Sequence, residues 1–314
     1  MPVADQKPAV DAVLQKVLAA VPFQLSTDIP VDEARRQFRE LPRLPVHPEV
    51  RVEDRTVPGP AGAVPVRVYR PPATVGTTAP VVVYLHGGGW ALGDLDTYDG
   101  TARRHAVGAE AVVVSVEYRL APEHPYPAAV DDVWAATQWV AAHADELGVD
   151  ATRLAVAGDS AGGNLSAVVA LLARDAGAPA VRFQLLWYPA TTWDTSLPSF
   201  TENAEAPILG LGAVQGFSRW YAGHVDLSDP PATLVPARAE LAGLPAAHIA
   251  VAGHDPLRDD GARYAELLAA AGVPVTLNNA ETLVHGYLAY VGVVPAATEA
   301  FETAMTALRN ALHS

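Results

Sequence analysis

The sequence predicts an α/β protein with a mostly parallel, eight-stranded sheet and helices on both faces. Short apolar runs such as "APVVVYLH" (79–86) and "AVVVSVEY" (111–118) are typical of strands buried on both faces. Segments with helical spacing of apolar residues lie between such runs, and strands that alternate with helices along a chain form a parallel sheet. The chain has 314 residues, of which 50% are hydrophobic, and this length and composition allow a large core.

The chain opens with two predicted helices and a proline-rich break. Apolar residues recur at helical spacing on one face of segment 10–21, and a second helix is predicted over 31–41. Three prolines in "LPRLPVHPEV" (41–50) then interrupt helical structure. Two alternating segments, 50–58 and 63–70, predict antiparallel strands that are joined by the turn at 59–62.

About six mostly parallel strands are predicted after this hairpin, with one interruption. The strands are expected at 79–86, 111–118, 153–158, 181–189, 247–253 and 273–280, and the helices near 97–108, 127–146, 161–175, 258–271 and 295–312. Residues 190–246 lack this alternation, and a structureless loop of that length is uncommon inside a compact domain. We therefore expect an insertion with its own helices, one of them over 214–222.

Composition excludes several classes of function. The net charge of −14, without a basic cluster, argues against nucleic-acid binding. The chain has no cysteine, which rules out disulfides, thiolate catalysis and cysteine-ligated zinc, and we expect no metal. No apolar stretch is long enough to predict a transmembrane helix. Asp5, Lys7, Asp11 and Lys16 interrupt the N-terminal segment, so no signal peptide is predicted and we expect a cytoplasmic protein.

A serine stands at a tight corner between a predicted strand and a predicted helix. Gly158, Ser160 and Gly162 fit the pattern Gly-x-Ser-x-Gly in "RLAVAGDSAGGNLSA". Such a turn needs small residues on either side, and it lifts the serine hydroxyl to the positive end of a helix dipole. The pattern therefore predicts a nucleophile, with a simple helix N-cap as the alternative.

A nucleophilic serine also needs hydrogen-bond donors for the developing oxyanion. "HGGGW" (86–90) follows a buried strand, and consecutive glycines let bare backbone N–H groups approach a ligand. The alternative is a flexible glycine turn. No Gly-Lys-Ser/Thr follows, as a phosphate loop requires, and the spacing does not fit a dinucleotide fingerprint. We therefore expect no cofactor.

An acid and a base are predicted at the ends of later strands. Asp255 follows the strand at 247–253, although an Asx-turn or N-cap would also explain it, and Asp259 and Asp260 fit the first turn of a helix. His285 follows the last strand. His254 is adjacent to Asp255, but neighbours in an extended chain point in opposite directions. The order Ser160, Asp255, His285 is the order of a catalytic triad on the α/β-hydrolase fold.

The sequence resembles the hormone-sensitive-lipase-like carboxylesterases of the α/β-hydrolase superfamily. The matching stretches run from about 80 to 290 and are "YLHGGGWALGD", "VSVEYRLAPEHPYPAAVDD", "LAVAGDSAGGNLSA", "AGHDPLRDDGARYAELL" and "VHGY". The resemblance implies Ser160 as nucleophile, Asp255 as the residue that orients the base, and His285 as base. It also implies an oxyanion hole from the backbone N–H groups of Gly88, Gly89 and Ala161, with a structural role for His86.

The resemblance further implies a helical cap over the site. Its domain division is an N-terminal cap part (1–45), a first core part (46–189), a cap insertion (190–240) and a second core part (241–314). Aromatic residues of these cap segments would line an apolar substrate pocket or pack the cap onto the core; they are Phe23, Phe200, Phe217, Trp220 and Tyr221. Leu283 and Val284 precede the histidine where family members often have methionine.

The expected function is hydrolysis of short- to medium-chain acyl esters through an acyl-enzyme intermediate. The alternatives are an amidase or an acyltransferase with the same triad, or a non-catalytic small-molecule receptor. Arg119, Glu123 and Asp131 are expected to pair with one another and to fix their loop. The predicted strand at 273–280 would expose an unpaired edge, through which a homodimer could form.

Overall fold

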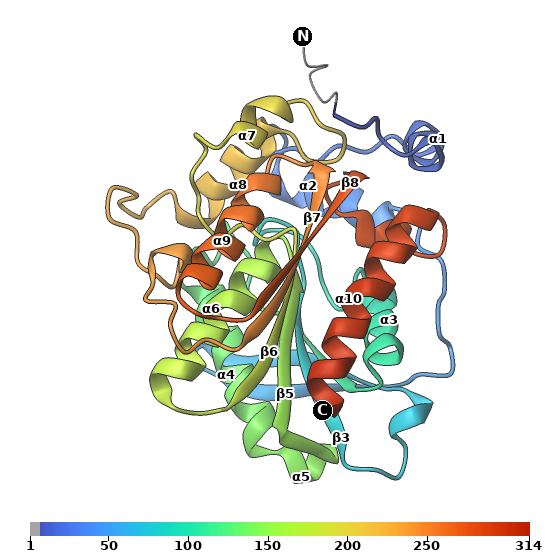
Figure 1. Cartoon of the computed structure of the whole chain (residues 1–314), viewed down its shortest axis with the longest axis vertical. Helices are drawn as coiled ribbons and strands as arrows, with labels where there is room; N and C mark the ends of the chain where they lie inside the picture. Colours follow the sequence, from blue (N-terminus) through green and yellow to red (C-terminus); the bar gives the residue numbers. More distant parts are fainter. Residues whose placement is uncertain (1–6) are drawn as a thin grey trace.

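The structure is a computed structural model that describes residues 7–314; residues 1–6, with Asp5 and the start of the predicted 1–45 segment, lie outside the described residues. One eight-stranded sheet crosses the molecule in the order β1-β2-β4-β3-β5-β6-β7-β8 (Figure 1). Its strands are β1 (Arg51–Gly59), β2 (Gly62–Arg70), β3 (Ala79–Leu85), β4 (Val112–Val116), β5 (Val149–Asp159), β6 (Val181–Trp187), β7 (Ala246–His254) and β8 (Val275–Val284).

Strand directions confirm the predicted mostly parallel sheet. Neighbouring strands are parallel from β4 through β8, whereas β1 and β2 form an antiparallel hairpin and β2 joins β4 antiparallel. Gly59 lies opposite Gly62, so the hairpin turns at the predicted place. The fold class predicted from the alternation of strands and helices is therefore correct.

Burial explains why the sequences of some strands are continuous runs of apolar residues. Every residue of β3 and β4 is buried. Their valines suit a central position because β-branched side chains pack well on a pleated surface that is covered on both faces. β8 is the edge strand of the parallel part, and Leu277 on it is 46% exposed. A homodimer through this edge stays a prediction.

Helices cover both faces of the sheet (Figure 1). α3 (Asp99–Ala109) and α10 (Pro295–His313) share one apolar core with Leu14 of α1 (Ala12–Ala20). The opposite face carries α4 (Ala128–Ala142), α6 (Ala161–Ala176) and α9 (Arg258–Ala270), which share a second core. The two cores use alternate side chains of the same strands, since successive residues of a strand point to opposite faces.

The helical segment predicted near 127–146 is present, with an interruption at His143. α4 ends there and a short helix, α5 (Ala144–Leu147), follows. The backbone N–H and Nδ1 of His143 both lie 2.9 Å from the carbonyl oxygen of Trp139, and the two rings stack. The side chain thus adds a second hydrogen bond to a carbonyl group that already accepts from the backbone.

The segment 190–246 forms helices of its own, as predicted. It holds α7 (Pro198–Glu202), α8 (Leu211–Ala222) and the 3-10 turn η2 (Pro236–Arg238), and α8 begins three residues before the predicted 214. Residues of α2 (Val31–Glu40), α7 and α8 meet in a third apolar cluster that includes Ala34, Phe200 and Phe217. The four helices α1, α2, α7 and α8 lie at one end of the molecule (Figure 1). The division into core and cap remains a prediction.

The ion pairs expected within "YRLAPEHPYPAAVDD" have different partners. Arg119 pairs with Asp132, at 2.8 Å, and not with Asp131. Glu123 pairs with Arg35 of α2, at 2.7 Å. The prediction that Arg119, Glu123 and Asp131 pair with one another is therefore wrong, since helical geometry turns Asp132 inward and the N-terminal segment supplies the arginine for Glu123.

Within residues 7–314, no helix combines the length and the apolar character that crossing a bilayer would require.

Candidate active site

Ser160 occupies the corner between β5 and α6. Its backbone has φ 55° and ψ −116°, a conformation that non-glycine residues rarely adopt and that costs about 1–3 kcal/mol. The side chain makes no capping hydrogen bond to the helix that it precedes. The N-cap alternative is therefore excluded, and the hydroxyl group is available for a different partner.

The two glycines of the Gly-x-Ser-x-Gly pattern are required by close backbone approach. A Cβ at Gly162 would lie 1.9 Å from the carbonyl oxygen of Leu85, and one at Gly158 would lie 2.3 Å from the carbonyl oxygen of Gly162. Both glycines are buried, with α6 pressed against the end of β3. The corner can be this tight only because neither position carries a side chain.

His285 joins Ser160 to Asp255 through hydrogen bonds on its two ring nitrogens. The Nδ1–H group donates to Oδ2 of Asp255 at 2.7 Å, which leaves Nε2 to accept from the Ser160 hydroxyl at 3.0 Å. Asp255 is fully buried and His285 is 4% exposed. The ring of Tyr188 lies 4.7 Å from the imidazole ring, centroid to centroid, and limits how that ring can turn. The three residues predicted from separate motifs are thus in contact.

Asp255 is held in place from several sides. Its Oδ1 accepts from the backbone N–H of Leu257 at 2.8 Å, so the Asx-turn alternative is also realised, with the second oxygen left for His285. The side chain of Asn203, after α7, donates to the Asp255 carbonyl group at 3.0 Å. His254 points elsewhere, with Nε2 2.8 Å from the carbonyl oxygen of Pro8.

Gly88 and Gly89, in the glycine loop after β3, line the same cavity as Ser160. Gly88 and Gly89 have φ angles of 105° and 60°, which favour glycine. A Cβ at Gly89 would lie 2.4 Å from the ring of Phe217. No hydrogen bond to another group of residues 7–314 occupies the N–H of Gly88 or Gly89, and Ala161 begins α6, where N–H groups have no intrahelical partner.

Asp159 braces this glycine loop, a role that the sequence analysis did not identify. Its Oδ1 accepts from the Tyr84 hydroxyl at 2.7 Å and from the Gly87 N–H at 2.9 Å. The Tyr98 hydroxyl donates to Oδ2 at 3.3 Å. Burial raises the pKa of Asp159 to about 6 even though these donors favour the ionised form. Its position beside Ser160 in "GDSAGG" was the available signal.

His86 stabilises the same loop as a neutral side chain. It is fully buried, and its ring stacks on Tyr118 with a centroid distance of 4.3 Å. Nδ1 lies 2.8 Å from the carbonyl oxygen of Gly87. Burial lowers the pKa of His86 to about 4, so the ring is uncharged at neutral pH. These contacts fit the structural role that was expected for it.

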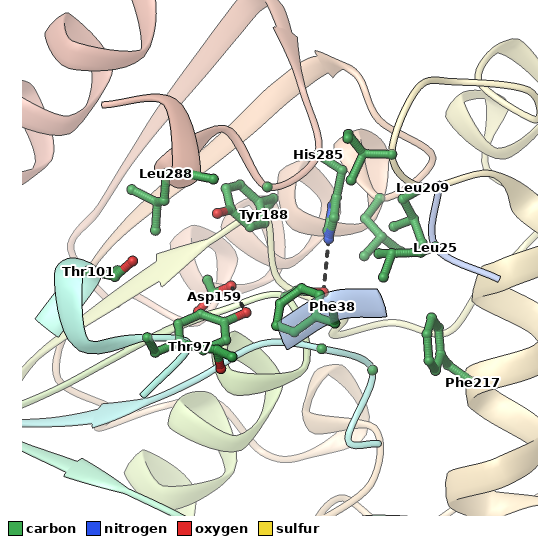
Figure 2. Close-up of a pocket in the computed structure, with 18 of the residues that line it drawn as sticks. Leu25, Phe38, Thr97, Thr101, Asp159, Tyr188, Leu209, Phe217, His285 and Leu288 are labelled. Atoms are coloured by element: carbon green, nitrogen blue, oxygen red, sulfur yellow. Dashed lines mark hydrogen bonds between the residues drawn. The ribbon is translucent and has the colours of Figure 1, made fainter. Parts of the chain in front are cut away.

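Ser160 and His285 line a cavity of about 1000 Å³. Figure 2 shows His285 beside Leu25 and Leu209, with Thr97, Thr101 and Leu288 to one side and Phe217 of α8 to the other. Most of the lining side chains are apolar, and they come from α1, α2 and α8 as well as from the loops at the carboxyl ends of the strands. An apolar cavity with a few polar groups is typical of a small-molecule site.

Three of the five predicted aromatic residues line this cavity. They are Phe23, Phe200 and Phe217. Tyr221 instead stacks on Trp90, at 4.5 Å and an interplanar angle of 1°, and Trp220 packs edge-on against Phe217. Both proposed uses of these aromatic residues, pocket lining and packing, therefore occur. In the described part of the chain, no three His, Asp or Glu side chains gather as metal ligands.

Comparisons with known proteins identify the family of the chain. Residues 82–289 match the family described as alpha/beta hydrolase fold. The chain is 63% identical to esterase LipI of Mycobacterium tuberculosis, over 99% of this chain and 98% of that protein. It is 35% identical to arylacetamide deacetylase of Oryctolagus cuniculus, over 73% of each. The crystal structure of DphMB1 superposes with a TM-score of 0.93 at 70% identity, over 97% of this chain and 99% of that one.

Sequence, fold and cavity lead to the same family. The match of residues 82–289 covers most of the chain, and the similarity to LipI extends over nearly all of it. The chain therefore belongs to the hormone-sensitive-lipase-like carboxylesterases of the α/β-hydrolase superfamily and is a carboxylic ester hydrolase.

Proposed function

We propose that this chain hydrolyses short- to medium-chain acyl esters, with Ser160 as nucleophile, His285 as base and Asp255 as the residue that orients it. The observation that carries this proposal is the pair of hydrogen bonds on His285, 2.7 Å to Asp255 and 3.0 Å to Ser160. A nucleophile, a base and a residue that orients the base within hydrogen-bond reach are the requirements of covalent acyl transfer.

In the first half-reaction, His285 takes the hydroxyl proton as Oγ of Ser160 bonds to the ester carbonyl carbon. The negative charge on the carbonyl oxygen is stabilised by the N–H groups of Gly88, Gly89 and Ala161, and one such donor contributes about 3–4 kcal/mol in the transition state. Asp255 stabilises the protonated imidazole, which then gives its proton to the leaving alcohol. The product of this half-reaction is the acyl-enzyme.

In the second half-reaction, water takes the place of the alcohol. His285 accepts a proton from the water as its oxygen bonds to the acyl carbon, and returns the proton to Oγ of Ser160 as the acid leaves. Asp159 and His86 support both halves because they hold the backbone of Gly87 and so fix the position of Gly88 and Gly89.

Replacement of the nucleophile tests the proposal. Ser160→Ala should lower kcat for a p-nitrophenyl butyrate substrate by a factor on the order of 10⁶, as in other serine hydrolases. Circular dichroism and thermal unfolding should be close to those of the wild type, because alanine fits the same corner. Activity that survives the substitution in a folded protein would refute the role of Ser160.

An amide substrate is the second candidate, because one relative is named an arylacetamide deacetylase. A matched ester and amide of the same acyl group and the same aromatic ring would separate the two activities. We expect the ester to react faster, since its alcohol leaves more readily than an amine.

Covalent labelling separates an enzyme from a receptor. An organophosphonate should add its mass to the peptide that carries Ser160, and Ser160→Ala should take up none. A wild-type protein that binds the reagent without a covalent mass change would favour the receptor.

A further inference from the structure

One arm of the cavity leads away from Ser160 between α3 and the segment that follows His285. We call it the α3 arm and define it by Val21, Thr101, Arg104, Leu288 and Val293, all of which line the cavity. Thr101 and Leu288 lie on the side of His285 that is opposite to Phe217 (Figure 2). Arg104 stands one helical turn beyond Thr101, about 4.5 Å further along the α3 axis.

Arg104 is the unusual residue of the α3 arm. It is half-buried, and a Cβ at Gly292 would lie 3.3 Å from Nη1 and 3.4 Å from Nη2, so the guanidinium group lies against this loop. Within residues 7–314, no carboxylate lies within 4 Å of it, and it donates no hydrogen bond to a protein group. Its neighbour Arg103, in contrast, pairs with Asp99 at 2.7 Å.

The other charged residues near the α3 arm already form ion pairs or hydrogen bonds within the protein. Asp99 pairs with Arg103 and lies 3.7 Å from Arg67, and Asp96 pairs with Arg67 at 2.9 Å. Arg43 uses its guanidinium group for backbone carbonyl oxygens, among them that of Thr97 at 2.9 Å. No nearby acid therefore offsets the charge of Arg104, and burial lowers its pKa without a carboxylate that would raise it.

We propose that Arg104 binds a carboxylate carried by the substrate, so that the enzyme favours esters with a second, ionised carboxyl group. Half-esters of dicarboxylic acids have this chemistry. The planar guanidinium group can donate two parallel hydrogen bonds to a carboxylate, and the apolar side chains of Val21, Leu288 and Val293 suit the methylene chain between the two ends. This inference rests on the proposed function, because the reacting ester must reach Ser160.

Paired substrates test the inference. Monoethyl succinate, adipate and sebacate would each be compared with the neutral diethyl ester of the same acid. In the wild type, kcat/KM for at least one half-ester should exceed that for its diester. Arg104→Gln should reduce this ratio about 10-fold, mainly through KM, which corresponds to about 1.4 kcal/mol. Arg104→Lys keeps the positive charge but lacks the planar guanidinium group, which can donate two parallel hydrogen bonds. This variant should therefore give a ratio of half-ester to diester kcat/KM between those of the wild type and Arg104→Gln.

Arg219 provides a matched control. It lines the cavity on the side of α8, is exposed, and pairs with no carboxylate within residues 7–314. Arg219→Gln should keep the wild-type ratio. If this variant lost the ratio and Arg104→Gln kept it, the carboxylate would bind on the side of α8, and the inference would be overturned. Equal ratios in the wild type and Arg104→Gln would overturn the inference.

The carboxylate could belong to the acid or to the alcohol part of the ester. Butyryl esters of glycolate carry the charge on the alcohol part. The ratio of their kcat/KM to that of a neutral butyryl ester would distinguish the two sources. Turnover of the diethyl esters tests the proposed function separately. Calorimetry of half-ester binding to Ser160→Ala, with and without Arg104→Gln, tests the inference even without turnover: unchanged affinity would overturn it.

Discussion

Ser160 combines a strained backbone with a hydroxyl group that is hydrogen-bonded to His285 and makes no capping bond to α6. Its φ of 55° is tolerated because Gly158 and Gly162, two positions away on either side, carry no side chain and because its N–H donates to the carbonyl oxygen of Trp187 at 2.8 Å. The strain directs Oγ at His285 and away from the helix that starts at the next residue. A local cost of about 1–3 kcal/mol is thus associated with the placement of one reactive atom.

Asp159, next to Ser160, gives a pH-dependent stability that can be measured. An aspartate in an unfolded chain titrates near pH 3.9, whereas burial raises the pKa of Asp159 to about 6 in the fold. Its protonated form is therefore favoured by folding, and this stabilisation is present below about pH 4 and lost as the pH rises through about 6. Two units of pKa correspond to about 3 kcal/mol.

Asp159→Asn removes this titration. The free energy of unfolding of the variant relative to the wild type should rise by about 3 kcal/mol between about pH 4 and pH 7.5, because only the wild type loses stability over that range. Urea unfolding at both pH values measures the difference. Asp28→Asn, at an exposed position, is the control. A difference that does not change with pH would show that Asp159 does not titrate in this range.

At the scale of elements, the corner between β5 and α6 depends on close backbone packing. Gly162→Ala would put a Cβ 1.9 Å from the carbonyl oxygen of Leu85, so α6 or β3 would have to move. We expect a loss of about 3 kcal/mol in the free energy of unfolding, in the range for overpacked sites, and a loss of esterase activity.

A glycine in an open position gives the control for that substitution. No atom lies within 4 Å of a Cβ built at Gly212 in α8, so Gly212→Ala should keep the wild-type stability or raise it by up to about 1 kcal/mol. Thermal and urea unfolding of both variants would decide. Equal stability of Gly162→Ala and the wild type would contradict the packing argument.

Contacts between distant elements also fix the loops around the site. Arg35 of α2 binds Glu123 and the carbonyl oxygens of Ala91 and Ala121, and so joins the N-terminal segment to the loops that follow β3 and β4. The Asp260 carboxylate accepts from the backbone N–H groups of Thr191 and Thr192, at 2.6 and 2.8 Å, where the 190–246 insertion begins. Each contact joins a predicted cap segment to a loop or helix of the predicted core part.

At the scale of the whole molecule, the cavity bears on the proposed preference for short and medium acyl chains. Its volume is about 1000 Å³, at the upper end of ordinary small-molecule sites, and its walls are mostly apolar. The proposed function predicts that, in a series of p-nitrophenyl esters, kcat/KM is highest for short and medium acyl chains and falls for palmitate. Highest turnover on emulsions of long-chain triglycerides would contradict this expectation.

Local patterns in the sequence predicted the order of the strands along the chain, the class of the fold and the three residues that we propose for catalysis. Continuous apolar runs identify strands buried on both faces, and the Gly-x-Ser-x-Gly corner has a steric cause that sequence reasoning can reach. Asp255 and His285 followed because the carboxyl ends of parallel strands meet at one edge of a sheet. The interruption of the helix at His143, where the side chain adds a hydrogen bond to its own preceding turn, was in contrast not predicted.

Only the tertiary structure decided which charges meet. Segments that are far apart in the chain supply the partners of Arg119 and Glu123 and place the Asp159 side chain beside Gly87. The tertiary structure also leaves Arg104 without a carboxylate within 4 Å among residues 7–314. His285 itself bonds a serine 125 residues away. Hydrogen bonds and ion pairs are fixed by distances of a few ångströms, whereas a sequence pattern fixes only the period and the direction of each element.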